Sequence, residues 1–429
     1  MKLGIVGAGF VGLSIGAVFA EKGHSVVLVD VDREKIKKIN SGEAPFYEPG
    51  LKELLEKHAG RNLRASEDYS ELLDREIIFI CVGTPSKQNG EIDLRFVEAA
   101  ARSLAGVLKK VEDYKLIAVK STVIPTTTER VVIPLLENSG KVLGKDFGVC
   151  VNPEFLREGS AIRDFLHQDR VVIGANDKST GDMLEKLYRK DFPSSPIVRT
   201  DLRTAEMIKY ASNAFLATKI SFINEIGNIC KKLNIDVYKV VEGMKHDPRI
   251  GASFLRAGMG FGGSCFPKDV RALANFAKKL GEKARILEAV LHVNEKQPEK
   301  MIEIAKKRVG TLKNKKVAVL GLAFKPGTSD TRESRALPLI LKLIEEGAEV
   351  VVYDPVARLP EEANLDGVKV ANSLEEAVKE AEVIKIATEW EDFKELEKMK
   401  DILEGKLIIE GRRMFGEKPR ELRIEGICW

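Results

Sequence analysis

Residues 2–12 read Lys-Leu-Gly-Ile-Val-Gly-Ala-Gly-Phe-Val-Gly, a short apolar strand that runs directly into the pattern G-x-G-x-x-G. The sequence predicts that a helix follows to about Lys22. A second apolar strand, Ser25 to Val29, then ends at Asp30. Because strand, glycines, helix and acidic strand end occur in the required order, this segment predicts a βαβ unit that binds a dinucleotide.

The three glycines have different physical roles in such a unit. Gly7 permits the tight turn after the strand, and Gly9 lets the backbone approach a pyrophosphate. Gly12 lets the helix pack closely against the strand, and the positive end of the helix then faces the phosphate charge.

Asp30 lies 18 residues after Gly12, where a carboxylate accepts hydrogen bonds from both ribose hydroxyls. The same carboxylate repels a 2′-phosphate, so NAD is favoured over NADP, although Arg33 and Lys35 soften that repulsion. The alternative is that Asp30 only caps the next helix.

The composition excludes several other classes. The chain has 429 residues, enough for two or three domains, and 69 Lys+Arg stand against 65 Asp+Glu with both signs interspersed. No nucleic acid is therefore expected as a partner. No apolar run reaches the roughly 18 residues that span a bilayer, and the apolar start lacks a cleavage site, so we expect no membrane association and a cytoplasmic location.

Three further apolar strands each end in a small polar loop. These strands are Glu76 to Val82, Leu116 to Lys120 and Val149 to Val151. In open α/β sheets ligands bind beyond the carboxyl ends of the strands, so the three loops predict one site. Strands at Arg170 to Gly174 and Ile197 to Val198 complete this domain near residue 198.

A long helix is predicted from Thr200 to about Leu233, apolar around much of its circumference, as a buried or interface-forming helix must be. Helical pattern continues to about Pro298, interrupted by one glycine-rich loop, Gly258 to Asp269. Residues Lys316 to Phe324 then echo the start of the chain.

A later strand of this echo, Glu349 to Tyr353, ends at Asp354. Its glycines are degenerate and Lys325 has entered the loop, which suits a nucleotide diphosphate, although a purely structural domain is the alternative. The predicted fold is α/β, with two Rossmann-like doubly wound domains joined by a long central helix. The predicted parts are 1–198, 199–300 and 301–429.

Cys265 is the candidate nucleophile, because glycines precede it and Lys268 and Asp269 follow it. The five cysteines are widely spaced without a zinc or disulfide pattern, so no metal is expected and all should be reduced thiols. For the other four we expect structural roles: Cys81, Cys150, Cys230 and Cys428.

Two pairs of polar residues are further candidates. Lys209 and Asn213 share one face of the long helix and could polarise an oxyanion, or could form a surface stripe. Glu154 and Glu158 follow a strand and could act as acid, base or water-positioning groups, or could be helix N-terminal charges.

With these residues the sequence resembles the UDP-glucose/GDP-mannose dehydrogenase family over nearly its whole length. The motifs that carry the resemblance are Gly7 to Gly12, Asn152 to Gly159, Asp169 to Gly174, Glu206 to Tyr210, Asp247 to Gly251, Gly262 to Asp269 and Gly321 to Ser334. The resemblance implies an NAD domain, a central helix that forms a dimer and a UDP domain. It also implies a four-electron oxidation of a nucleotide-sugar C6 alcohol to the carboxylate, with two NAD and one water per sugar.

The resemblance also implies roles for individual residues. The catalytic residues are Cys265, which forms a thiohemiacetal and then a thioester, and Lys209, Asn213, Asp269, Glu154 and Thr122. The NAD-binding residues are Gly7, Gly9, Val11, Gly12, Asp30, Lys35, Thr84, Thr122, Glu158, Lys268 and Arg332. The substrate-binding residues are Glu154, Phe155, Leu156, Arg157, Glu158, Lys209, Asn213, Arg249, Phe254, Leu255, Arg256, Ala257, Gly258, Gly262, Lys325 and Arg412. Arg249 matches an arginine that can reach the substrate from a partner subunit.

Within the family, the motif details favour UDP-glucose as substrate and UDP-glucuronate as product, with a homodimer or higher homo-oligomer as the assembly. GDP-mannose is the closest alternative substrate. UDP-N-acetyl-mannosamine fits less well, because Phe266 to Asp269 departs from that branch. A dinucleotide-sensing scaffold without turnover is the hypothesis from another class, and the intact candidate residues argue against it.

Overall fold

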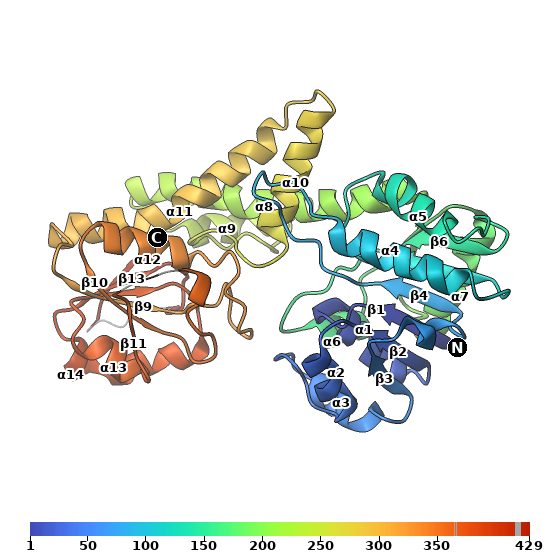
Figure 1. The fold of residues 1–429 in the computed structure, drawn as a ribbon. Coiled ribbons are helices and arrows are strands. Elements are labelled where there is room, and N and C mark those ends of the chain that lie inside the picture. The colour runs from blue at the N-terminus through green and yellow to red at the C-terminus, as the bar shows by residue number, and fades with distance from the viewer. Residues whose placement is uncertain (364, 366, 417–421) are drawn as a thin grey trace. The chain divides into compact units, whose positions relative to one another are not determined.

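The computed structural model describes residues 1–363, 365, 367–416 and 422–429. Over these residues the chain divides into two compact units, 1–212 and 213–429 (Figure 1). No helix in the described part of the chain is both long enough and apolar enough to span a membrane.

In the first unit, all of whose residues are described, eight strands form one sheet in the order β3-β2-β1-β4-β5-β6-β7-β8. Neighbouring strands run parallel, except that β7 is antiparallel to β6. The strands are β1 (Lys2–Val6), β2 (Ser25–Val29), β3 (Leu63–Ser66), β4 (Ile77–Ile80), β5 (Lys115–Val119), β6 (Phe147–Val151), β7 (Val171–Ala175) and β8 (Ile197–Thr200). Its first six strands have the order of a doubly wound dinucleotide fold, with the switch point between β1 and β4.

Helices cover both faces of this sheet, because successive strand residues point to opposite sides. Ile77 and Phe79 pack in one apolar cluster with α1, α3, α6 and α7, whereas Ile78 and Ile80 pack in the other with α4 and α5. The helical segments are α1 (Phe10–Glu21), α2 (Arg33–Asn40), α3 (Leu51–His58), η1 (Tyr69–Leu72), α4 (Arg95–Leu108), η2 (Thr128–Val132), α5 (Ile133–Glu137), α6 (Ala161–Leu166) and α7 (Lys178–Asp191).

The predicted βαβ unit is confirmed, since β1, α1 and β2 lie within a residue of their expected bounds. Strands β4, β5 and β6 are parallel neighbours, so their three polar loops lie at one edge of the sheet, as predicted.

The predicted long helix is α8 (Leu202–Lys232), which begins in the first unit and ends in the second (Figure 1). It is followed by α9 (Val237–Met244), α10 (Phe266–Lys279) and α11 (Arg285–Val309).

Two details of the helical region differ from the sequence prediction. The expected glycine loop ends earlier, because Phe266 to Asp269 form the first turn of α10, with Pro267 where a missing N–H costs nothing. The helical pattern also does not stop at Pro298, which lies inside α11. Flanking side chains hold α11 through this point, since Gln297 Nε2 donates to the Gly258 carbonyl (3.0 Å) and Asn294 binds Phe261.

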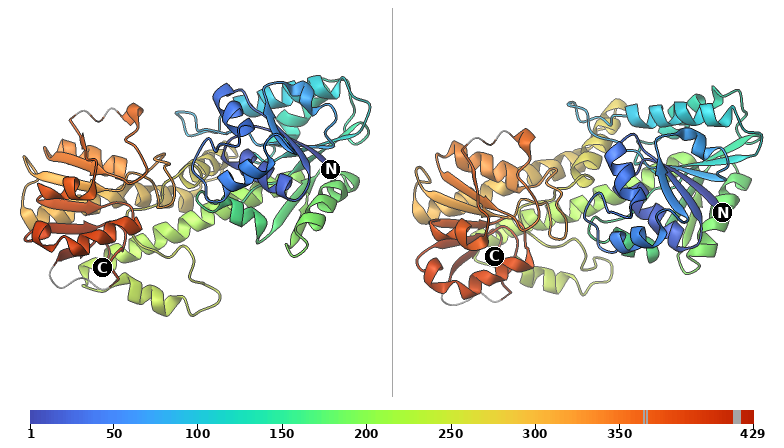
Figure 2. Two further views of the ribbon diagram at one scale, coloured as in Figure 1. Left: turned by 90° about the horizontal axis from the view of Figure 1, so that it is seen from below. Right: turned by 60° about the horizontal axis from the view of Figure 1, so that its bottom comes forward.

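Over its described residues, the second unit has a six-stranded parallel sheet in the order β11-β10-β9-β12-β13-β14. This repeats the order of the first six strands of the first unit. Figure 2 shows this part of the chain in orange to red. The strands are β9 (Lys316–Leu320), β10 (Glu349–Tyr353), β11 (Lys369–Val370), β12 (Val383–Ile386), β13 (Leu407–Glu410) and β14 (Arg423–Gly426). The remaining helical segments are α12 (Ala336–Glu345), η3 (Glu361–Ala363), α13 (Leu374–Lys379), η4 (Glu391–Lys398) and α14 (Lys400–Leu403). The three-part division of the chain stays a prediction, and its boundary at residue 300 falls within α11.

Candidate active-site residues

In the glycine loop after β1, the fold itself requires two of the glycines, whereas the third leaves space for a ligand. A side chain on Gly12 would place its Cβ 1.9 Å from the Gly7 carbonyl oxygen, and Gly7 has φ +97 with its Cβ position 2.9 Å from the Cys81 carbonyl oxygen. Folding alone therefore requires both glycines. Around Gly9, by contrast, no atom lies within 4 Å of the Cβ position, so the protein leaves open the space that a pyrophosphate would need.

Helix α1 begins directly after this loop and has no side-chain cap, because its N-cap residue is Gly9. Its first backbone N–H groups therefore remain available to an anion. Asp30 accepts from Ala8 N (2.7 Å) and Asp32 N (3.0 Å), and Lys35 Nζ lies 3.5 Å from it. The residue that caps α2 is Asp32, not Asp30, so the capping alternative for Asp30 is wrong. Loop, helix end and carboxylate together fit a dinucleotide.

The loops after β4, β5 and β6 are linked to one another. Ser121 Oγ donates to the Val82 carbonyl (2.7 Å), which joins the first two loops. Thr84 is buried and Thr122 is half-buried. The parallel order of β4, β5 and β6 places Thr84, Thr122 and the residues after β6 along one edge of the sheet.

Lys209 and Glu154 form a buried ion pair in the first unit. Lys209 Nζ lies 2.9 Å from Glu154 Oε1, and the two side chains are 4% and 7% exposed. The other carboxylate oxygen of Glu154 accepts from Leu156 N (2.5 Å). Lys209 is therefore not part of a surface stripe, and Glu154 is not a helix N-terminal charge, because α6 begins only at Ala161.

Phe155, on the loop after β6, contacts two cations, Arg170 just before β7 and Lys209 on α8. The Arg170 guanidinium sits 3.7 Å from the ring centroid and the Lys209 ammonium 5.4 Å from it. Burial lowers the pKa of Arg170. The stacking holds Phe155 in place beside Glu154 and thereby orders the loop.

In the second unit, Cys265 is the N-cap residue of α10, and its side chain is half-exposed. Its sulfur lies 3.6 Å from Ser264 Oγ. A helix N-terminus favours negative charge, so this position suits a thiolate. The other four cysteines are buried, as predicted, and burial raises the pKa of the Cys81, Cys150 and Cys428 thiols to about 12.

Asp269 connects two other candidates of this unit. Asn213 Nδ2 donates to Asp269 Oδ2 (2.7 Å), and Lys268 Nζ donates to Asp269 Oδ1 (2.6 Å). Asn213 and Asp269 are both buried. Asp269, four residues after Cys265, therefore fixes the side-chain amide of Asn213 on α8 and the ammonium of Lys268 on α10.

The loop after β9 repeats the turn of the first unit without its open carboxylate. Gly321 has φ +96, close to that of Gly7. Asp354, at the end of β10, accepts from Leu322 N (2.7 Å) and Ala323 N (3.0 Å). Lys325 lies over the Phe324 ring at 5.6 Å.

Glu389 pairs with two of the predicted substrate-binding arginines. Its carboxylate oxygens lie 3.3 Å from a guanidinium nitrogen of Arg256 and 4.0 Å from one of Arg412. Arg412 also donates to the Gly260 carbonyl. Gly258 and Gly262 leave no room for a side chain, because a Cβ would lie 2.5 Å from the Gly411 carbonyl oxygen and 2.4 Å from that of Glu333.

Other predicted residues lie at the surface or in the core. Three arginines are exposed and pair with neighbouring aspartates: Arg157 with Asp164, Arg249 with Asp247 and Arg332 with Asp330. Leu255 and Ala257 are buried, so any ligand contact there would fall to their backbone. Val11 and Glu158 are half-buried, and Phe254 has φ +64 and packs beside Phe266.

Sequence reasoning missed two buried charges near the site. Lys120, after β5, binds Asn152 and Tyr188. Glu206, on α8, accepts from Thr126 N and Thr128 N, and burial raises its pKa to about 7. A charged residue at the end of an apolar strand was the available signal for Lys120.

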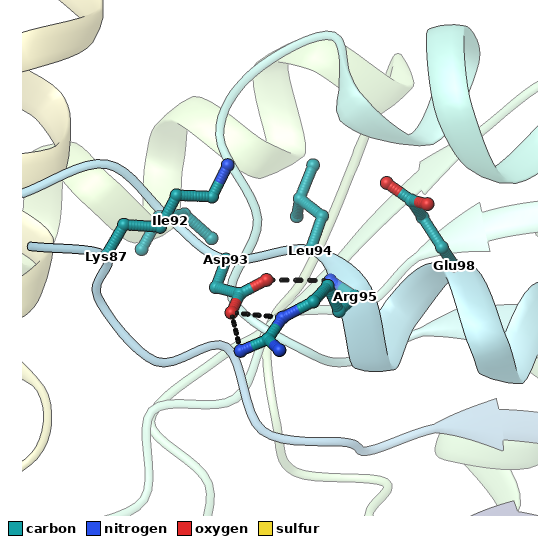
Figure 3. A pocket seen from close by; sticks show the side chains of 6 residues that line it. All are labelled: Lys87, Ile92, Asp93, Leu94, Arg95 and Glu98. Atoms are coloured by element: carbon teal, nitrogen blue, oxygen red, sulfur yellow. Dashed lines mark hydrogen bonds and ion pairs between the residues drawn. The ribbon is translucent and has the colours of Figure 1, made fainter.

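Figure 3 shows a hollow near the loop after β4, lined by Lys87, Ile92, Asp93, Leu94, Arg95 and Glu98. Arg95 folds back onto Asp93 in this hollow and holds the pKa of that carboxyl below its usual range. None of the predicted site residues lines it. Within the described ranges, no cluster of His, Cys, Asp and Glu could hold a metal ion.

A glycine turn at a helix N-terminus and an acidic residue at the end of the second strand fit the cofactor of an NAD-dependent dehydrogenase, and the second unit offers a half-exposed thiol. The chain belongs to the UDP-glucose/GDP-mannose dehydrogenase family. It matches that family's NAD binding domain over residues 1–191, its central domain over 203–296 and its UDP binding domain over 318–417.

Individual relatives agree with this assignment. The chain is 45% identical to the UDP-glucose 6-dehydrogenase AglM of Haloferax volcanii, over 96% of this chain and 97% of that protein. It is 39% identical to the GDP-mannose 6-dehydrogenase of Pseudomonas syringae pv. tomato, over 100% of both chains. A UDP-glucose dehydrogenase structure from Pyrobaculum islandicum matches with a TM-score of 0.92 at 40% identity, over 100% of this chain and 98% of that one. The predicted fold, family and cofactor NAD are thereby confirmed.

Proposed function

We propose that this enzyme oxidises the C6 alcohol of UDP-glucose to the carboxylate of UDP-glucuronate, with two NAD and one water per sugar. The half-exposed Cys265 thiol at the N-terminus of α10 carries this proposal, because the other four cysteines are buried. The relatives named for UDP-glucose, at 45% and 40% identity, support the choice of sugar nucleotide.

The chemistry divides into two oxidations and a hydrolysis. The alcohol first loses a hydride from C6 and its hydroxyl proton, which gives an aldehyde. The Cys265 sulfur then forms a bond to the aldehyde carbon, and the oxygen takes a proton to give a thiohemiacetal. Loss of a second hydride and the hydroxyl proton gives a thioester. Water adds to its carbonyl carbon, the C–S bond breaks, and the carboxylate leaves with the thiolate restored. NAD, when bound, accepts the hydride in each oxidation.

We propose that Lys209 stabilises the oxygen that becomes negative, with assistance from Asn213. Glu154 would serve as acid and base in thioester hydrolysis, which fits its direct contact with Lys209. Asp269 would position a water or proton carrier, and its bond to Asn213 supports a shared role. Thr122 would lie close to the substrate or to the hydrolytic water.

NAD would be held by the glycine turn, the α1 N-terminus and Asp30, together with Val11, Lys35, Thr84, Thr122, Glu158, Lys268 and Arg332. The nucleotide sugar would be held by Lys325, Arg412, Arg256, the residues 154–158, 254–258 and Gly262, Lys209 and Asn213. The match to a UDP binding domain over 318–417 supports the place of Lys325 and Arg412 in this set.

A homodimer through α8 is the proposed assembly. Phe215, Phe222 and Ile229 recur every seven residues and so share one face of this helix, and they are 65%, 49% and 51% exposed. Large apolar side chains in such a row would be covered by the same face of a second copy. Arg249, exposed and paired with Asp247, would then be available to the substrate of the partner subunit.

Phe222→Glu should weaken this dimer, because it places a charge in the apolar row. Sedimentation velocity at several protein concentrations would measure the effect, with Lys186→Glu, at an exposed residue of α7, as a control. A wild-type chain that sediments as a monomer at micromolar concentration would contradict the proposal.

A reducing compartment is proposed for the enzyme. None of its five described cysteines forms a disulfide, and the mechanism requires a thiol.

The function is tested by supplying purified enzyme with NAD and a panel of UDP-glucose, GDP-mannose and UDP-N-acetyl-mannosamine. The count of NADH formed per sugar consumed should be two, with UDP-glucose the best substrate by kcat/KM. A count of one, or a preference for GDP-mannose, would contradict the proposal. Nucleotide binding without any NADH would favour the scaffold hypothesis.

A further inference from the structure

Lys120 is a buried lysine to which the proposed chemistry gives no role. It directly follows β5 and is 2% exposed. Its Nζ lies 2.9 Å from Asn152 Oδ1, 3.3 Å from the Asn152 carbonyl oxygen and 3.3 Å from the Tyr188 hydroxyl. An ammonium has three N–H donors, so its hydrogen bonds are complete, although no carboxylate of the fully described first unit lies within ion-pair distance.

The acceptors of Lys120 join several elements. Asn152 follows β6, and its Nδ2 donates to the Val172 carbonyl of β7 (2.8 Å). Tyr188 comes from α7, and its hydroxyl donates to Asn152 Oδ1 (2.5 Å). The rings of Phe165 and Tyr188 lie 5.6 and 5.9 Å from the ammonium. One network therefore ties the end of β5 to the end of β6 and to α7, beside two aromatic rings.

This network lies at the start of the two loops that carry proposed site residues. Thr122 comes two residues after Lys120, and Glu154 comes two residues after Asn152. A bond between residues 120 and 152 therefore fixes where both loops leave the sheet.

We propose that Lys120 is a positioning residue, whose ammonium holds Asn152 and thereby sets Glu154 and Thr122 in the geometry for thioester hydrolysis. This inference rests on the proposed function, since it assigns Lys120 to a step of that reaction. Buried networks that satisfy every donor are rigid, and small displacements of a catalytic group cost large factors in rate.

The charge of Lys120 is also sensitive to pH. Burial lowers its pKa to about 8; the neighbouring Cys81 and Glu154 act to raise it, and Lys209 acts to lower it. Tyr188, the other titratable group in contact, has its pKa raised by burial beyond the range of an assay. A neutral amine has only two N–H donors for three acceptors, so the network should lose a bond as pH rises through about 8.

The first test compares Lys120→Met with the wild type. The variant should lose roughly 10- to 100-fold in kcat, with KM for NAD and UDP-glucose nearly unchanged. The thioester should accumulate on Cys265, visible by intact-mass spectrometry of the quenched enzyme, because hydrolysis has become slow. Lys115→Met is the matched control, since Lys115 is a second buried lysine, at the first residue of β5, and burial also lowers its pKa.

The second test does not require a buried lysine to be removed. Tyr188→Phe takes away one acceptor of the ammonium, which disfavours the charged form and lowers the pKa of Lys120. The fall of kcat near pH 8 should therefore move to lower pH by about half a unit to one unit. NMR titration of 13Cε-labelled lysine should show the same shift directly, with the Lys120 signal assigned from the Lys120→Arg variant.

The outcomes separate the two proposals. If the wild type forms no NADH from any nucleotide sugar, the proposed function is overturned and this inference with it. If the wild type turns over but Lys120→Met keeps its kcat, or loses activity only to the extent of Lys115→Met, the positioning role alone is overturned. If Lys120→Met fails to fold, Tyr188→Phe decides, because an unmoved pH profile and titration would contradict the inference.

Discussion

The two sheets of this molecule share one design but end their second strands in different ways. Each places a glycine with φ near +97 after its first strand, and an aspartate at the end of the next strand binds the backbone N–H beyond that glycine. Asp354 has five donors among the described residues: Leu322 N, Ala323 N, Val356 N, Ala357 N and Trp390 Nε1. A carboxylate has about four acceptor positions, so Asp354 is saturated by the protein.

Asp30 has only three donors within the fully described first unit, the N–H groups of Ala8 and Asp32 and the ammonium of Lys35. It therefore retains capacity for ribose hydroxyls. The helices differ too, because α1 starts at residue 10 directly after its glycine turn, whereas α12 starts only at residue 336. The aspartate of the same strand–glycine–strand–aspartate pattern thus keeps acceptor capacity in one unit and is saturated by the protein in the other. What distinguishes them is whether the protein saturates the carboxylate and whether a helix N-terminus follows the glycine turn directly.

The largest expected effect is a difference in protein stability between variants at the two aspartates. Asp354→Ala leaves buried donors without an acceptor and should lower the free energy of unfolding by at least about 3 kcal/mol. Asp30→Ala should lower it by about 1 kcal/mol and instead narrow the preference for NAD over NADP. Urea unfolding and kinetics with both cofactors would measure the two effects. Equal destabilisation by both variants would remove the distinction between the two carboxylates.

The next effect concerns the pH dependence of stability and Lys385, a buried lysine of the second sheet. Lys385 on β12 donates to the Met301 carbonyl (2.8 Å), and burial lowers its pKa to about 7. Between that pH and about 10.5 the unfolded chain binds the proton that the folded chain has lost, so stability should rise with pH across this window. Lys385→Met should remove roughly 3–4 kcal/mol of this rise.

Urea unfolding at pH 6.5 and 9.5 would measure this, with Lys316→Met, at a half-buried lysine of β9 that pairs with Glu380, as the control. An unchanged slope in Lys385→Met would show that Lys385 does not carry the pH dependence.

Two substitutions in the glycine turn should separate effects on NAD binding from effects on stability. Gly9→Ala meets no atom within 4 Å, so its thermal stability should stay near that of the wild type while NAD affinity falls by about 100-fold. Gly12→Ala should lose stability as well, because its Cβ would collide with the Gly7 carbonyl. Calorimetric titration with NAD and a thermal melt test both variants. Full NAD affinity in Gly9→Ala would show that no pyrophosphate lies there.

Lys325 tests the ligand of the second unit. Lys325→Ala should weaken binding of the nucleotide sugar by about 10- to 100-fold, the loss of one charge-assisted hydrogen bond, and leave NAD affinity unchanged. Titration with each ligand separately would measure this. Weakened NAD binding with an intact affinity for the sugar nucleotide would reverse the assignment of the two units.

The sequence was sufficient to predict the architecture but not the pairings of its polar side chains. Residues 2–12 predicted the first βαβ unit because turn, period and glycine spacing are local properties. The pairing of Lys209 with Glu154 joins residues 55 apart, and that of Asn213 with Asp269 joins residues 56 apart. Only tertiary packing brings such groups together. For the same reason the sequence could not predict the hydrogen-bond network of Lys120 or the saturation of Asp354. It could predict the burial of the four structural cysteines.

Cys265→Ser tests the central claim most directly, because a serine alkoxide can still capture the aldehyde while its ester should hydrolyse more slowly than a thioester. Cys230→Ser, at a buried cysteine, is the matched control. After mixing with NAD and UDP-glucose, intact-mass spectrometry should show Cys265→Ser heavier by one substrate-derived acyl group and Cys230→Ser unchanged in mass with normal turnover. A Cys265→Ser enzyme that carries no adduct and still forms two NADH per sugar at near the wild-type rate would contradict covalent catalysis by Cys265.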